Sequence, residues 1–213
     1  MMSPRRPAAL ANGDHRTLRD HLIATAARLV AERGCATLTV RAIAREAGVA
    51  DGVLYNHFTD KEELLALALH AHVRAAEQAL GMPPPRAGEG TVADNLRAYV
   101  ERALALHGAI LPAFDGLTPH SKVLARFAET GGHPAGGLGL RGELREYLEA
   151  ERTLGRLDPA ARVGTAVTMI VGACHEVVLP PAFRGGGEPA GPPPEGFAAD
   201  LAATVLSGIA ARP

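Results

Sequence analysis

The sequence predicts an all-α fold, and three observations support this. Apolar residues recur at spacings of three and four through most of the chain, which is the period of amphipathic helices. No stretch shows the strict apolar-polar alternation of a β-strand. Segments rich in glycine and proline, such as residues 129–137 and 180–196, separate the periodic stretches and are typical of loops. With 213 residues and 47% apolar content, the chain can bury one large core or two small ones.

The first helix is predicted over residues 18–33, where apolar positions share one face. Gly34, just past the last periodic residue, is expected to end it. The preceding residues, 1–16, are rich in Pro, Ala and Arg without periodicity. They are expected to form a flexible N-terminal arm.

A short helix is predicted directly before Gly48, with apolar residues at i, i+3, i+4 and i+7. Gly48 can adopt the left-handed conformation that ends a helix. The chain restarts at once, and a second short helix is predicted over residues 50–57, with Leu54 and Phe58 facing inward. Two short helices joined by a tight glycine turn form a helix-turn-helix. The apolar positions of the first of them are Val40, Ile43, Ala44 and Ala47.

The outward side of the second short helix carries short or planar polar groups beside a glycine, at which another backbone can come close. Such a face suits a DNA groove. The candidate residues are Asp51, Gly52, Tyr55 and Asn56.

The stretch over residues 39–61, TVRAIAREAGVADGVLYNHFTDK, resembles the DNA-binding domain of the TetR family of transcriptional repressors. The resemblance implies an N-terminal three-helix helix-turn-helix DNA-binding domain, expected over residues 17–62, and a C-terminal helical ligand-binding and dimerisation domain over residues 63–213. It also implies that Thr39, Arg41, His57 and Lys61 contact phosphates. The residues that carry the resemblance are Thr39, Arg41, Ile43, Ala44, Ala47, Gly48, Val49, Leu54, Tyr55, Phe58 and Lys61.

The chain departs from the family pattern at Ala50 and Val53, where serine or threonine is frequent. The second helix thereby lacks an N-cap oxygen, which Asp51 is expected to supply, and one hydroxyl that could bind phosphate. A helical hairpin inside another kind of all-α domain is the alternative interpretation of the motif.

Two overlapping pairs, Thr59 with Glu62 and Asp60 with Glu63, predict the start of a helix over residues 61–80. In the resembled family this helix joins the DNA-binding domain to the rest of the chain. Further helices are predicted over residues 91–111, 121–129, 138–157, 158–179 and 195–211.

The last two helices carry apolar stripes, and Asp158 followed by Pro159 predicts the start of the first of them. The resembled family dimerises through its last two helices, which predicts a homodimer. Completion of the core within one subunit is the alternative role for the stripes. The candidate interface residues are Val163, Val167, Ile170, Cys174, Val178, Phe197, Leu201, Val205 and Ile209.

A small-molecule pocket is expected in the C-terminal domain, because the resembled family binds effectors between helices there. Each candidate lining residue has ordinary core packing as its alternative role. The candidates are Leu104, His107, Leu111, Phe114, Phe127, Met169 and Glu176.

Catalytic and metal-binding patterns are missing from the sequence. The nine histidines include no His-x-x-x-His pair, and the two cysteines are far apart without a Cys-x-x-Cys motif. The pair His175 and Glu176 is interpreted as a buried hydrogen-bonded pair rather than a ligand set. We therefore expect no metal, no cofactor and no enzymatic activity.

Charge is distributed unevenly although the net charge is −1. Residues 1–61 hold nine basic and six acidic side chains, which gives a mildly basic N-terminal part on an acidic remainder. No signal peptide and no apolar run long enough for a membrane span are apparent, so a cytoplasmic location without membrane attachment is expected.

The resemblance, together with these observations, implies a homodimeric, ligand-responsive regulator, a repressor that a small-molecule effector releases from a pseudo-palindromic DNA operator. Two alternatives remain open: an α-helical small-molecule binding protein, and an effector-independent DNA binder or activator on the same fold. The operator sequence, the effector and the regulated genes cannot be inferred from the sequence.

Overall fold

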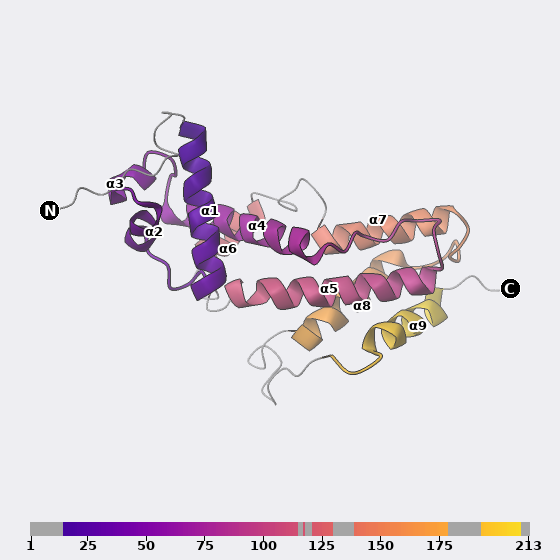
Figure 1. Ribbon diagram of the computed structural model, residues 1–213. Coiled ribbons are helices and arrows are strands. Elements are labelled where there is room, and N and C mark those ends of the chain that lie inside the picture. The colour runs from indigo at the N-terminus through magenta and orange to yellow at the C-terminus, as the bar shows by residue number, and fades with distance from the viewer. Residues whose placement is uncertain (1–14, 115–116, 118–120, 130–138, 179–192, 210–213) are drawn as a thin grey trace. The chain divides into compact units, whose positions relative to one another are not determined.

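The computed structural model describes residues 15–114, 117, 121–129, 139–178 and 193–209 (Figure 1). Within these residues the chain is helical and has no strand, which confirms the predicted all-α class. Most of the predicted arm and most of the loop over residues 180–196 lie outside the described residues. The helices are α1 (His15–Arg33), α2 (Val40–Ala47), α3 (Asp51–Leu54), α4 (Lys61–Leu80), α5 (Val92–Phe114), α6 (Ser121–Glu129), α7 (Gly139–Thr153), α8 (Val163–Val178) and α9 (Phe197–Ile209).

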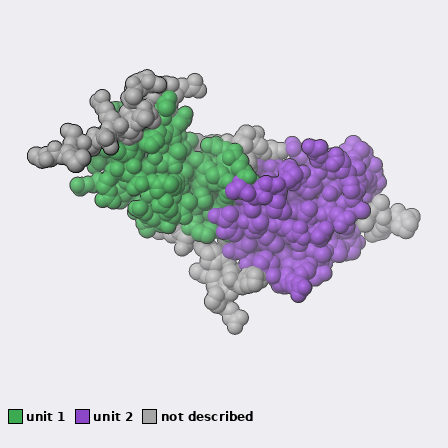
Figure 2. All heavy atoms as spheres, in the orientation of Figure 1, with its two compact units in different colours: residues 1–78, 110–136 green, residues 79–109, 137–213 purple. Residues whose placement is uncertain are grey.

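The chain forms two compact units, shown in different colours in Figure 2. Unit 1 comprises residues 1–78 and 110–136, and unit 2 comprises residues 79–109 and 137–213. The first unit therefore extends beyond the domain expected over residues 17–62. It does so because most of α4 packs into the same core as α1 to α3, and because the end of α5 and all of α6 join that core.

In unit 1, α2 packs on α1 and α3 packs on α2, and Figure 1 shows α2 and α3 together on one flank of α1. The loop after α1 is tied to the end of α5, since the Cys35 N–H donates to the Ala113 carbonyl at 3.1 Å. Burial of each large apolar side chain stabilises the unit by about 1.5–3 kcal/mol. Among the core residues are Leu22, Leu29, Ile43, Leu54, Phe58, Leu64, Leu69 and Val123.

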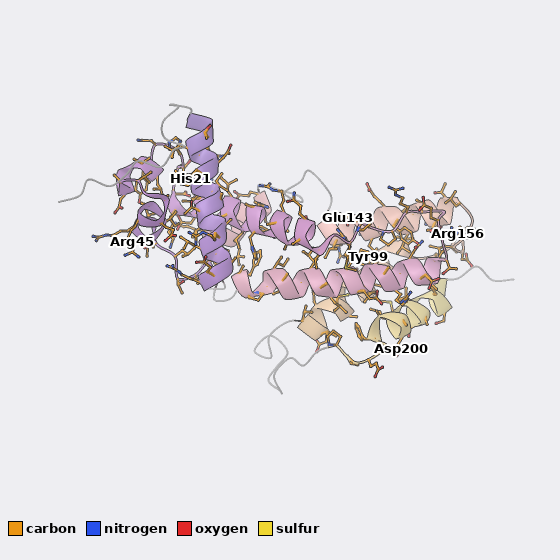
Figure 3. The ribbon with its side chains drawn as sticks, in the orientation of Figure 1. His21, Arg45, Tyr99, Glu143, Arg156 and Asp200 are labelled. Carbon is orange, nitrogen blue, oxygen red and sulfur yellow. The ribbon has the colours of Figure 1, made fainter. Side chains whose placement is uncertain are left out.

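Unit 2 packs the first part of α5 against α7, α8 and α9. Two polar contacts join its helices: the Tyr99 hydroxyl donates to the Leu140 carbonyl at 2.6 Å, and the buried Arg102 guanidinium meets Glu143 at 2.8 Å. Figure 3 labels Tyr99 and Glu143 where α5 and α7 face each other. Among its core residues are Leu96, Val100, Leu144, Leu148, Val167 and Ile170.

The start of α8 differs from the prediction. Asp158 does not cap a helix that begins at Pro159. Its carboxylate instead accepts the Ala160 N–H at 2.7 Å in a short turn, and the helix begins at Val163. An Asp-Pro pair fits either structure, because aspartate side chains stabilise both turns and helix starts.

Within the described residues, no helix combines the length and the apolar character that crossing a bilayer requires.

Candidate nucleic-acid interface

The helix α2 is fixed at both ends by its own sequence. Thr39 is its N-cap in extended conformation, and its hydroxyl accepts the Ala42 N–H at 3.1 Å. Gly48 ends it with φ 71°, in the left-handed region, and its N–H bonds the carbonyls of Ala44 and Arg45. This confirms the predicted helix and its glycine stop.

The helix α3 is shorter than the sequence predicts. Ala50 is the N-cap and makes no side-chain capping bond, and Asp51 is the first helical residue rather than the cap. After Leu54 the chain continues as a tight turn, since Asn56 N–H donates to the Val53 carbonyl at 3.2 Å in an i to i+3 bond. Phe58 then returns to the core, 4% exposed.

The predicted base-facing side chains lie on the open side of this motif. Tyr55 is 62% exposed, the largest exposure among the large apolar side chains that the structure describes. Asp51 and Asn56 are exposed too, and apart from the adjacent residues and the backbone of α3 no described atom lies within 4 Å of the place where a Cβ on Gly52 would sit. These four residues therefore form a free surface with Tyr55 as its largest group.

The four residues predicted to contact phosphates differ in their exposure to solvent. Thr39 and Arg41 are exposed, whereas His57 and Lys61 are half-buried. Lys61 contributes to a shallow apolar groove, open to solvent, that lies between α2, α3 and the start of α4. The groove is lined by Val40, Leu54, Tyr55, Phe58, Asp60, Lys61 and Leu64.

The start of α4, beside Lys61, is held by charged hydrogen bonds. Asp60 accepts the Glu63 N–H at 2.7 Å, and Glu63 accepts the Thr59 N–H at 2.7 Å. The predicted cap at Asp60 is thus present, with the returning bond made to Thr59. Burial acts to raise the pKa of Glu63, but the bonds from Thr59 and the Arg19 guanidinium outweigh it and lower that pKa.

Arg45 is a further exposed basic residue of the helix-turn-helix that was not among the predicted DNA contacts. It lies one turn after Arg41 on the exposed side of α2, and Figure 3 shows its side chain extending away from that helix. The neighbouring acid Glu46 is paired with Arg28, which also bonds Glu32 at 2.6 Å. The available signal was the i, i+4 spacing of two arginines on the first helix of the motif.

The candidate effector residues are divided between the units. Leu111, Phe114 and Phe127 lie in unit 1, where the two phenyl rings meet edge to face at 5.3 Å. In unit 2, Leu104 packs beside the core, whereas Met169 is 49% exposed and Glu176 is exposed as well. The last two therefore do not line an enclosed space within the described part of unit 2.

His107 is the polar candidate inside unit 2. Its ring meets that of His175 at 4.8 Å, and its buried Nδ1 has no hydrogen-bond partner among the described residues. Burial lowers the pKa of His107 to about 4, and the nearby His175 adds to this. The Ala103 carbonyl favours the charged form but is not in hydrogen-bond geometry with Nδ1. Burial, together with Arg141, also lowers the pKa of His175, so both rings are neutral at pH 7.

Most of the candidate interface residues are buried inside one subunit. Val163, Val167, Ile170, Cys174 and Val205 are 0–3% exposed in the core of unit 2. This placement favours the alternative role of completing that core, because a side chain without exposed area cannot meet a partner. Val178, Phe197 and Leu201 are half-buried, and the side chain of Ile209 lies outside the described residues.

Metal ligands do not converge in the described residues, where no group of three or more His, Cys, Asp or Glu side chains could hold an ion. Both cysteines are buried thiols whose pKa burial raises to about 11.

Comparison with known proteins identifies the N-terminal segment. Residues 22–68 match the model of a family described as bacterial regulatory proteins, tetR family. The HTH-type transcriptional repressor KstR2 of Mycolicibacterium smegmatis is 47% identical over 47 residues, which are 22% of this chain and 23% of that protein. The matched part spans less than half the length of the curated relatives considered.

Solved structures match over nearly the whole chain. The TetR family transcription regulator SCO0332 is similar with a TM-score of 0.60 and 25% identity, covering 90% of this chain and 97% of that one. The flavonoid-responsive regulator FrrA is similar in fold with a TM-score of 0.59 and 22% identity, covering 92% and 98%. Both the N-terminal motif and the helical remainder thus follow one known architecture.

Proposed function

This chain belongs to the TetR family of transcriptional regulators through residues 22–68, and on that premise we propose that it is a homodimeric repressor that binds a pseudo-palindromic DNA operator and leaves it when a small molecule binds unit 2. Proteins of this kind are transcription regulators rather than enzymes. We accordingly assign it a cytoplasmic role on double-stranded DNA.

The observation that carries the proposal is the free surface around Tyr55. Asp51, Gly52, Tyr55 and Asn56 stand exposed on a motif whose inner face is fully packed. A side chain of that size costs free energy in water unless a partner covers it, and a major groove offers base edges and sugars to a planar polar ring. The basic side chains of Arg41, Arg45 and Lys61 flank this surface, where phosphates lie in helix-turn-helix complexes.

Pairing of two subunits follows from the operator geometry that the motif demands. Two recognition surfaces reach successive major grooves when they lie about 34–36 Å apart, which one subunit alone cannot provide. We assign the contact to the exposed faces of α8 and α9 instead of their buried stripes. These faces carry Thr165, Met169, Gly172, Ala199, Ala203 and Ser207.

The effector site is assigned to unit 2 around His107, His175 and Leu104. An unpartnered imidazole nitrogen in an apolar setting is costly, and a ligand with a hydrogen-bonding group removes that cost. FrrA, with the same fold, is described as flavonoid-responsive, which supports a small-molecule site in this architecture.

Nuclease footprinting of the DNA upstream of the gene tests the proposal. We expect one protected pseudo-palindrome with wild-type protein and none with Tyr55→Ala, whose surface is altered while its core is not. Absence of any protected site would remove the regulator assignment and favour a helical small-molecule binding protein.

A ligand screen by thermal shift distinguishes the proposed ligand-responsive repressor from the second alternative, an effector-independent DNA binder. An effector raises the unfolding temperature because it binds the folded state. It lowers operator affinity by the same factor by which operator DNA lowers the affinity for the effector, since linkage is reciprocal. Protection of the operator without any ligand response favours an effector-independent DNA binder.

A further inference from the structure

We propose that Arg126 of α6 is a positioning residue for the DNA-binding surface, acting through Asp60 on the start of the helix that begins at Lys61. The inference rests on the proposed function. Arg126 lies outside residues 22–68, the segment that matches the family, and outside the domain that the sequence predicts.

The contact joins two helices through a single carboxylate. Arg126 Nη2 donates to Asp60 Oδ2 at 2.9 Å, while Asp60 Oδ1 accepts the Glu63 N–H at 2.7 Å. Asp60 therefore caps α4 with one oxygen and binds α6 with the other. Any shift of Arg126 acts directly on the first turn of α4.

That turn lies beside the groups that face DNA. Asp60, Lys61 and Tyr55 line the same shallow groove, and Glu63 accepts the Thr59 N–H at 2.7 Å. The direction of the Lys61 side chain is set by the first turn of α4. A shift of this turn also moves Tyr55, because the chain between α3 and α4 is only six residues long.

The neighbouring residue of α6 makes a second contact with α4. The Phe127 carbonyl lies 3.1 Å from His70 Nε2, and the two rings stack with centroids 4.1 Å apart. Asp60 and His70 are about 15 Å apart along a helix axis. Contacts from two adjacent residues to points so far apart fix the angle of α6 relative to α4, which keeps Arg126 aimed at Asp60.

The pair contributes little to global stability, because its side chains are 40% and 37% exposed and solvent screens their attraction. A positioning role can therefore be separated from folding. Loss of the pair changes the placement of Lys61 and Tyr55 while the unfolding temperature stays nearly constant.

The test is a double-mutant cycle on operator affinity, measured by fluorescence anisotropy with the full-length chain and the footprinted duplex. The variants are Arg126→Gln, Asp60→Asn, which keeps an oxygen for the cap, and the double variant. Arg126→Lys retains the charge. The matched control is Lys122→Gln, which removes one positive charge from an exposed position one turn earlier on α6.

We expect Arg126→Gln and Asp60→Asn each to lower operator affinity about three- to tenfold. The affinity of the double variant should not fall below that of the single variant with the lower affinity. Arg126→Lys and Lys122→Gln stay within about twofold of wild type. Unchanged affinity in Arg126→Gln, or additive losses, overturns the proposal. So does a fall of about 0.9 per subunit in the salt slope of Arg126→Gln, since that marks a direct phosphate contact.

Amide hydrogen exchange, measured without DNA, tests the positioning role of Arg126 independently of the proposed DNA-binding function. In Arg126→Gln we expect faster exchange at Asn56, His57 and Glu63, and no change in Lys122→Gln. If the wild-type chain binds no DNA, the proposed function falls while the exchange data still report on the contact. Unchanged exchange in Arg126→Gln overturns the positioning role.

Discussion

His107 of α5 and His175 of α8 meet edge to face inside unit 2, with ring centroids 4.8 Å apart. Burial lowers the pKa of both rings, that of His107 to about 4. In the unfolded chain His107 takes up a proton near pH 6.5, so the unfolded state binds more protons than the folded state between pH 6.5 and 4. The contribution of His107 to the free energy of unfolding is therefore fully present above pH 6.5. It decreases as the pH falls from 6.5 toward 4.

The first prediction concerns this pH dependence. Between pH 7 and pH 5, His107 should cost the wild-type protein about 2 kcal/mol of unfolding free energy. The variant His107→Leu has no proton to bind and should lose about 2 kcal/mol less over the same interval. Urea unfolding at the two pH values measures both. Carboxylates titrate equally in the two proteins, so equal losses would show that His107 is not held neutral.

The second prediction separates two glycines of the helix-turn-helix. Gly52 has open space around it and lies in the first turn of α3, where alanine favours the helix. Gly52→Ala should leave the protein as stable as wild type or up to about 1 kcal/mol more stable. If DNA approaches the Gly52 backbone as proposed, the same variant should lose operator affinity on the order of tenfold, about 1.4 kcal/mol. Thermal unfolding and anisotropy measure the two effects.

Gly48→Ala serves as the contrast, because Gly48 has φ 71° and its role is conformational. An alanine there should destabilise unit 1 by about 1–2 kcal/mol. Wild-type DNA affinity of Gly52→Ala would show that the DNA backbone does not pass close to α3 at this point.

The third prediction concerns Arg45. It is exposed on α2 one turn from Arg41, and we expect it to neutralise one phosphate per subunit. Arg45→Gln should then lower the slope of log affinity against log salt by about 0.9 per subunit, with little change between operator and unrelated DNA. The control is Arg86→Gln, an exposed arginine in unit 2. An unchanged slope in Arg45→Gln places this residue away from the phosphates.

The helix-turn-helix was predictable because its signals are local. The spacing of Val40, Ile43 and Ala47, followed by Gly48, specifies one helix and its end within nine residues. The length of α3 was not predictable from the sequence. Leu54 and Phe58, which are four residues apart, are buried both if the chain between them is helical and if it is a turn with i to i+3 bonds. Exposure of Arg45 depends on which face of α2 the core covers, and the same spacing predicts that face.

Two features could not be predicted from the sequence because they depend on long-range contacts: what covers the apolar stripe of α8, and the inclusion of α6 in unit 1. An apolar stripe such as Val163, Val167 and Ile170 indicates that something covers it, but periodicity does not distinguish the same subunit from a partner. The inclusion of α6 in unit 1 depends on the burial of Val123 in that core and on contacts such as that of Arg126 with Asp60, 66 residues away, and no spacing rule predicts such contacts.

The last prediction concerns subunit pairing. Met169 is 49% exposed on α8, beside the small exposed residues Thr165 and Gly172, which let a partner helix come close. Met169→Glu should convert the dimer to a monomer at micromolar concentration, because a charge buried without a partner opposes association. Sedimentation velocity measures the mass, and operator affinity should fall with it. Leu154→Glu is the matched control, because Leu154 is another apolar side chain, 57% exposed, that follows α7 outside the proposed interface. A dimeric Met169→Glu, or a monomeric Leu154→Glu, would move the contact away from the exposed face of α8.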